Sequence, residues 1–198
     1  MVTRKLICCV AVAVLSNLFA NAQDGERIFK RFKGDVSLGR SYPINSNFYK
    51  GSLLALEPKY AVMDKLYVGL RMEGAVVDRF IDYGGFYSHE NKTIISLLGT
   101  ADYYFSNNYN FRPFFGVGAG TYGIALDAVD IEFKFGAIAR IGAEVKHFRI
   151  AVEYNGVPGI TIDSFILDNQ GNQVLTKEKL PNNYVGLKVG FCFGGGRL

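Results

Sequence analysis

The stretch "IEFKFGAIARIGAEVK", Ile131 to Lys146, changes side-chain type at every second residue. Its odd-numbered positions are all apolar, whereas its even-numbered positions carry glutamate, lysine, arginine, glycine and a single isoleucine. Successive side chains of a β-strand point to opposite faces of the sheet. The pattern therefore predicts a strand with one apolar face and one polar face.

Seven further segments follow the same alternation. It is clear in "HFRIAVEY" (residues 147–154) and in "YVGLKVGFCF" (residues 184–193). The less regular segments lie near residues 34–42, 50–60, 65–76, 93–105 and 111–122. No segment after residue 23 has a sustained helical period, and no apolar run is long enough for a membrane-spanning helix. The sequence predicts an all-β fold with eight strands.

The stretch "FRPFFGVGAGTYG", Phe111 to Gly123, indicates what surrounds these strands. One face is apolar, while the other carries glycine at positions 116, 118 and 120. An apolar face suits contact with lipid, where every backbone polar group must be paired within a closed barrel. The opposite face would then point into a lumen that, with eight strands, is only wide enough for side chains. The glycines would leave room for bulky neighbours across that lumen.

The connections between the predicted strands alternate between short and long. The short ones read "AVMD", "SNNYN" and "KH". The long ones read "PINSNFY", "VVDRFIDYGGFYSHENK", "GIALDAVD" and the stretch from Asn155 to about Asn182. Outer-membrane barrels have short periplasmic turns and longer external loops. Residues 34–198 are therefore predicted to form an eight-stranded antiparallel up-and-down transmembrane β-barrel, with residues 156–181 outside the cell and a hairpin tip at residues 169–172.

The first 22 residues have the layout of a secretory signal peptide. Arg4 and Lys5 precede an apolar run, and "ANA" at residues 20–22 supplies the small residues of a cleavage site. A membrane anchor is the weaker interpretation because the run is shorter than the roughly 20 residues that a bilayer needs. We expect cleavage before Gln23 and a solvated periplasmic tail over residues 23–33.

Cysteine content and charge exclude several classes of protein. Cleavage would leave Cys192 as the single cysteine, so neither an internal disulfide nor a zinc site is expected. Removing Arg4 and Lys5 from the 22 basic residues leaves 20 against 18 acidic ones, too small an excess for a nucleic-acid-binding protein. The chain has no phosphate-binding or dinucleotide-binding motif, and we expect no cofactor.

Four motifs in order resemble a known family, the small eight-stranded outer-membrane β-barrels of Gram-negative bacteria of the OmpX/OmpA type. They are "FRPFFGVGAG", "LLGTADYYF", "IGAEVKHFRIAVEYN" and "NYVGLKVGFCFGG". The resemblance implies a monomer in the outer membrane, in contact with membrane lipid and lipopolysaccharide and assembled by the barrel-assembly machinery. That family usually ends on an aromatic residue, whereas this chain continues past Phe193 as "GGGRL".

Charged residues gather on the face that would line the lumen. We expect them to pair with one another, because unpaired charges in a confined low-dielectric space are costly; a selectivity path for ions is the alternative. These residues are Glu57, Lys59, Arg71, Glu73, Asp102, Arg112, Glu132, Lys134, Arg140, Glu144, Arg149, Glu153 and Lys188.

Aromatic residues on the other face lie near the predicted periplasmic strand ends. Aromatic side chains favour the membrane–water interface, so these positions predict a girdle at that level. They are Tyr60, Tyr103, Phe105, Phe111, Phe115, Phe148, Phe191 and Phe193.

These features favour a structural or surface-interaction protein with a plugged lumen, acting through its external loops on an unknown ligand. A narrow channel or porin-like transporter is the alternative. A lipid-modifying enzyme is a distant third, because His89 with its neighbours Ser88 and Glu90 cannot readily converge as base, nucleophile and orienting group. A soluble lipocalin-like carrier would also have eight strands, but its apolar face would point inward.

Overall fold

The computed structural model describes residues 29–44, 50–82, 87–126, 130–167 and 173–195. The predicted signal peptide, the predicted hairpin tip at 169–172 and most of the predicted tail lie outside these residues. None of the described residues forms a helix with the length and apolarity that crossing a membrane requires.

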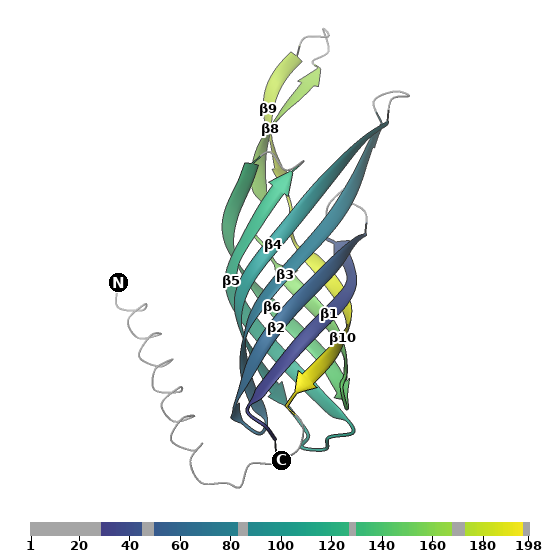
Figure 1. Ribbon diagram of the computed structural model, residues 1–198. Helices are drawn as coiled ribbons and strands as arrows, with labels where there is room; N and C mark the ends of the chain where they lie inside the picture. Colours follow the sequence, from purple (N-terminus) through teal and green to yellow (C-terminus); the bar gives the residue numbers. More distant parts are fainter. Residues whose placement is uncertain (1–28, 45–49, 83–86, 127–129, 168–172, 196–198) are drawn as a thin grey trace, which may run out of the picture.

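Eight antiparallel strands close into a barrel in which chain neighbours pair and the first strand meets the last (Figure 1). This confirms the predicted fold class. The barrel strands are β1 (Phe32–Pro43), β2 (Gly51–Met63), β3 (Leu66–Asp82), β4 (Tyr87–Tyr104), β5 (Arg112–Leu126), β6 (Asp130–Val145), β7 (Phe148–Gly156) and β10 (Tyr184–Gly194).

The strand register makes the barrel strongly staggered. A line of paired residues that starts at Phe32 of β1 returns to the same strand at Tyr42, ten residues further along. The line passes through Tyr60, Val68, Ala101, Val117, Ala139, Tyr154 and Val185. Such a stagger goes with strands tilted by roughly 35–45° from the barrel axis, and the tilt is visible in Figure 1.

The two ends of the barrel differ. The short turns β2–β3, β4–β5 and β6–β7 lie at one end, which we call the short-turn end, together with the start of β1 and the end of β10 (Figure 1). Lys146, in the two-residue turn between β6 and β7, has a positive φ of 56°. Strands β1, β3, β5 and β7 end at the opposite end of the barrel, which we call the hairpin end.

Two of the predicted long loops are largely strand. The sequence predicted strands near 65–76 and 93–105, but β3 continues to Asp82 and β4 already starts at Tyr87, with residue pairing along the whole extension. Likewise β5 and β6 leave only residues 127–129 between them. Residues 77–82 and 87–92 show no regular apolar alternation in the sequence, so a search for that alternation ends too early.

The long segment between β7 and β10 carries its own hairpin. Strands β8 (Ile160–Leu167) and β9 (Gln173–Leu180) form a separate two-stranded antiparallel sheet. Figure 1 shows this hairpin projecting from the hairpin end of the barrel.

The outer surface of the barrel is apolar. Large aliphatic side chains of every barrel strand are exposed there, for example Leu38, Leu70 and Ile141. The eight predicted girdle residues all point outward near the short-turn end: seven are exposed, and Tyr60 is half-buried against the ring of Phe32, 5.2 Å away between centroids. Phe32, which was not predicted to belong to the girdle, is itself 74% exposed.

Candidate functional site: a closed polar lumen

The lumen of the barrel contains a charge-balanced set of buried side chains, which we call the ion network. Strand alternation points all of them inward, and none is more than 6% exposed. Equal numbers of opposite charges matter, because a buried charge without a partner is strongly destabilising. The six cationic members are Lys33, Lys59, Arg71, Arg140, Arg149 and Lys188, and the six acidic members are Asp35, Glu57, Glu73, Asp102, Glu144 and Glu153.

Lys59 and Arg149 each contact three carboxylates in the part of the network nearest the short-turn end. Lys59 Nζ lies 2.6 Å from Asp35 Oδ2 and 2.7 Å from Asp102 Oδ2. Arg149 lies 2.9 Å from Asp102 Oδ2 and 2.7 Å from Glu144 Oε1. These contacts join strands β1, β2, β4, β6 and β7 across the lumen.

Arg140 occupies the middle of the network. Its Nε lies 2.8 Å from Asp102 Oδ1, its Nη2 lies 2.6 Å from Glu57 Oε1, and its Nη1 lies 3.9 Å from Glu153 Oε1. A Cβ at Gly116 would lie 2.1 Å from Asp102 Oδ1 and 2.8 Å from Arg140 Nε. Glycine at this position therefore makes the room that the Asp102–Arg140 pair needs.

The part of the network toward the hairpin end is built around Arg71, which is fully buried. Its two terminal nitrogens donate to the two oxygens of Glu153 at 2.8 and 2.5 Å, and it also pairs with Glu73. Lys188 Nζ lies 2.5 Å from Glu153 Oε2 and 3.0 Å from Glu73 Oε2. The Tyr184 hydroxyl donates to Glu73 Oε1 at 2.6 Å.

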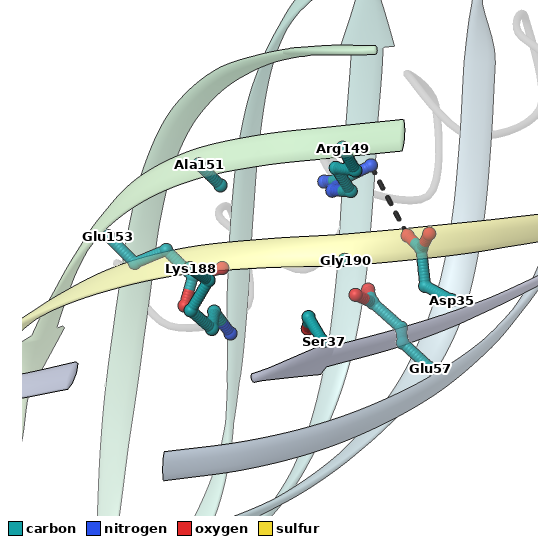
Figure 2. A pocket seen from close by; sticks show the side chains of 8 residues that line it. All are labelled: Asp35, Ser37, Glu57, Arg149, Ala151, Glu153, Lys188 and Gly190. Carbon is teal, nitrogen blue, oxygen red and sulfur yellow. Dashed lines mark ion pairs between the residues drawn. The ribbon is translucent and has the colours of Figure 1, made fainter. Parts of the chain in front are cut away.

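A small cavity lies beside the network where strands β1, β7 and β10 present the small residues Ser37, Ala151 and Gly190 (Figure 2). It leaves about 10 Å³ for the centre of a water molecule, which is room for roughly one water. In Figure 2, Asp35 and Arg149 are joined by their ion pair on one side, and Glu153 and Lys188 lie together on the other. Side chains thus fill almost all of this part of the lumen.

Apolar side chains fill the lumen between the ion network and the hairpin end. The barrel residues of this cluster are Leu53, Ala75, Val77, Ile94, Leu98, Tyr122, Ile124, Ile138 and Tyr184. Val157, Ile160 and Leu180, from the base of the β8–β9 segment, complete the same cluster. Lys92 Nζ donates to the Pro181 carbonyl at 3.1 Å and to Asn182 Oδ1 at 3.3 Å, which fastens that base to β4.

The structure brings most of the predicted lumen charges together, but it separates three of them. Glu132 and Lys134 pair with each other outside the network, with side chains 46% and 31% exposed. Their expected place in the buried network was wrong: they share the parity of Arg140, but they form a partly exposed pair near the start of β6. Arg112 is buried, but it lies between aromatic rings: its guanidinium carbon is 4.1 Å from the ring centre of Phe29 and 4.2 Å from that of Tyr104.

Two members of the network were missed in the sequence. Asp35 alternates with the outward-facing Val36, so its inward position could have been recognised. Lys33 was assigned to the tail because the apolar alternation is weak there, yet it lies within β1 and its Nζ pairs with Glu144. The inward apolar residues, such as Leu98 and Ile138, gave no signal because they break the polar face.

Three possible metal-binding atoms of Asp35, Glu144 and Cys192 lie within 4.8 Å of one another. The two carboxylates already accept contacts from Lys33, Lys59 and Arg149, and the Cys192 thiol donates to Asp35 Oδ1 at 2.6 Å. The cluster is therefore part of the ion network. The side chain of His89, the one enzyme-like feature of the sequence, lies outside the described residues.

No family model and no curated protein matches this chain. Among solved structures, the crystal structure of Neisserial surface protein A has a TM-score of 0.54 at 11% sequence identity, covering 82% of this chain and 95% of that one. The crystal structure of the outer membrane protein OprG from Pseudomonas aeruginosa has a TM-score of 0.54 at 15% identity, covering 87% of this chain and 100% of that one. The chain therefore has the fold of the small outer-membrane β-barrels.

Proposed function

We propose that this chain is an outer-membrane β-barrel protein with a plugged lumen, whose role is structural or interactive and is exerted through its surface. The observation that carries the proposal is the ion network of six cationic and six acidic side chains, which leaves room beside it for about one water. A protein that moves solutes along its axis needs a continuous path. Here the charged side chains of the lumen pair with one another and occupy the space that such a path would need.

The distribution of side chains supports a location in lipid. Exposed Leu, Ile, Val and Phe side chains surround the barrel, while charged groups lie inside. This is the inverse of a soluble carrier, which keeps its apolar face inward. Soluble monomers rarely expose contiguous apolar patches larger than a few hundred Å², whereas here every barrel strand contributes exposed large apolar side chains that a bilayer would cover.

The hairpin end offers the surface for an interaction. The β8–β9 hairpin and the extended β3–β4 hairpin both project there beyond the body of the barrel (Figure 1). Long connections of outer-membrane barrels face the outside of the cell. We expect lipopolysaccharide and an external ligand to contact these hairpins.

Cell fractionation with added protease tests location and orientation together. The chain should fractionate with the outer membrane and migrate differently on gels before and after heating, as folded barrels do. Trypsin added to intact cells should cut after the exposed Lys177 on β9 and spare the short-turn end. Cleavage after Lys65 or Lys146 with protection of Lys177 would invert the topology, and a soluble chain would refute the proposal.

A narrow channel is the second candidate, and the cavity beside Ser37 and Gly190 is the observation that favours it. Widening that cavity along the axis would require the 3.3 Å pair of Arg149 with Asp35 to separate.

A further inference from the structure

Phe29 is almost completely buried although it precedes the first barrel strand. Its side chain is 1% exposed, and its ring centre lies 4.1 Å from the guanidinium carbon of Arg112. The ring of Tyr104 lies 4.2 Å from the same carbon, so the flat cation of Arg112 has aromatic rings as its neighbours. Cations lying over aromatic faces at this distance are attracted by the ring electrons, more strongly where water is excluded.

The residues after Phe29 are fastened to the end of β2. The backbone N–H of Ala61 donates to the Arg31 carbonyl at 2.7 Å. The Arg31 guanidinium donates to the Tyr60 hydroxyl at 3.2 Å. These two contacts hold residues 29–31 at the short-turn end of the barrel.

Only one layer of side chains separates Phe29 from the ion network. Arg112 and Tyr104 form that layer, and the Tyr104 hydroxyl donates to Glu144 and accepts from Lys33 Nζ. Arg112 also donates to the Asp64 carbonyl in the β2–β3 turn at 2.8 Å. Loss of the Phe29 ring would therefore admit water to the Arg112 guanidinium, and this water would lie close to the first ion pairs of the network.

We propose that residues 29–31 are a stopper that closes the short-turn end of the lumen, with the Phe29 ring seated on Arg112. The segment acts as an internal ligand of the barrel: its ring supplies an aromatic partner of a buried cation, and its backbone accepts a hydrogen bond from Ala61 at the end of β2. This assigns a function to the residues before β1, and it stands whether or not the surface role proposed above is correct.

Chemical modification of arginine tests whether the stopper is seated in solution. The full chain, refolded in lipid or detergent, is treated with a small arginine-selective dicarbonyl reagent, and each arginine is followed by peptide mass spectrometry. Free arginine added to the same reaction and fully buried Arg71 are the references for fast and slow reaction. We expect Arg112 to react at least tenfold more slowly than free arginine, and Phe29→Ala to raise its rate at least tenfold while Arg71 stays protected.

The matched control is Phe32→Ala, which removes an aromatic ring three residues away that is 74% exposed on the outer face. This substitution should leave the modification rate of Arg112 as low as in the unmodified sequence. Fast reaction of Arg112 in the unmodified sequence, or an unchanged slow rate in Phe29→Ala, would overturn the proposal. If the heat-dependent gel shift shows that Phe29→Ala does not fold, Phe29→Leu replaces it, because leucine keeps an apolar side chain without the ring. Phe29→Leu should raise the modification rate of Arg112 at least threefold. An unchanged rate in this variant would also overturn the proposal.

Discussion

Arg71 has the most demanding position of any single residue in the lumen, since it is fully buried and pairs with both Glu73 and Glu153. Replacing it by alanine leaves the Glu73 and Glu153 carboxylates with Lys188 as their one close cation, since Arg140 Nη1 lies 3.9 Å from Glu153 Oε1. We expect Arg71→Ala to lower the free energy of unfolding by about 3–5 kcal/mol, the cost of breaking a buried pair by removing one partner. Urea unfolding of the refolded barrel in lipid measures this.

Lys134→Ala is the control at the same scale, because Lys134 pairs with Glu132 at the exposed part of β6. Exposed pairs contribute about 0–1 kcal/mol, so this variant should be nearly neutral. Equal, small effects of the two substitutions would mean that the ion network is hydrated and not a packed core.

Parity along a strand was sufficient to place most of the individual charges. Arg71 and Glu153 could be assigned to the lumen because their neighbours along β3 and β7 are apolar and face outward. Their partners could not be assigned, because the Arg71–Glu153 contact depends on how far β7 is shifted against β3 around the barrel. Glu132 and Lys134 have the same parity as Arg140, and only their height separates them from the network.

Strand β6 predicts how the outer face responds to charge. Ala139 points outward from it, between Ala137 and Ile141, and is exposed on the barrel surface. In a bilayer, an arginine near the midplane of a barrel costs about 2–4 kcal/mol, so Ala139→Arg should lower the free energy of unfolding in lipid by that amount. Ala139→Leu, which adds size without charge, should have little effect. Folding into vesicles that is indifferent to the arginine would argue for a soluble barrel.

The β8–β9 hairpin has parts with different roles. Leu180 and Ile160 at its base are 5% and 4% exposed and belong to the apolar cluster in the lumen. Leu180→Ala should therefore cost about 2–5 kcal/mol, as buried leucine-to-alanine changes do. Deleting residues 162–178 and joining the ends with a short glycine linker should leave the heat-dependent gel shift intact, because that part lies beyond the cluster. Loss of folding on this deletion would show that the whole hairpin supports the barrel.

Strand boundaries were predictable only where the outer face of a strand is apolar and its inner face is polar. β6 and β7 have an apolar outer face and carry charged or small residues on much of the inner face, and this alternation identified them. β3 continues to Asp82 and β4 starts at Tyr87. The sequence shows no apolar alternation near these two residues, so the end of β3 and the start of β4 were not predicted. The base of the β8–β9 segment was predicted to be part of an external loop, because the packing of Val157 and Leu180 into the apolar cluster of the lumen depends on the fold and leaves no periodic pattern in the sequence.

The whole molecule combines a stagger of ten residues, an apolar exterior and an interior in which the ion network lies between an aromatic-rich cluster toward the short-turn end and an apolar cluster toward the hairpin end. Each end is covered by a segment that precedes or interrupts the barrel strands: Phe29 at the short-turn end and Val157, Ile160 and Leu180 at the hairpin end. From these two covering segments and the ion network we infer that the barrel spans a membrane without opening a path through it.

Single-channel recording in planar bilayers tests that claim most directly. The refolded chain should insert without steady currents, and it should stay silent with Lys134→Ala, which lies outside the network. Steady single-channel currents from the unmodified chain that change with Arg140→Ala, the residue joining Asp102 to Glu57 in the middle of the lumen, would contradict the closed lumen and establish a channel.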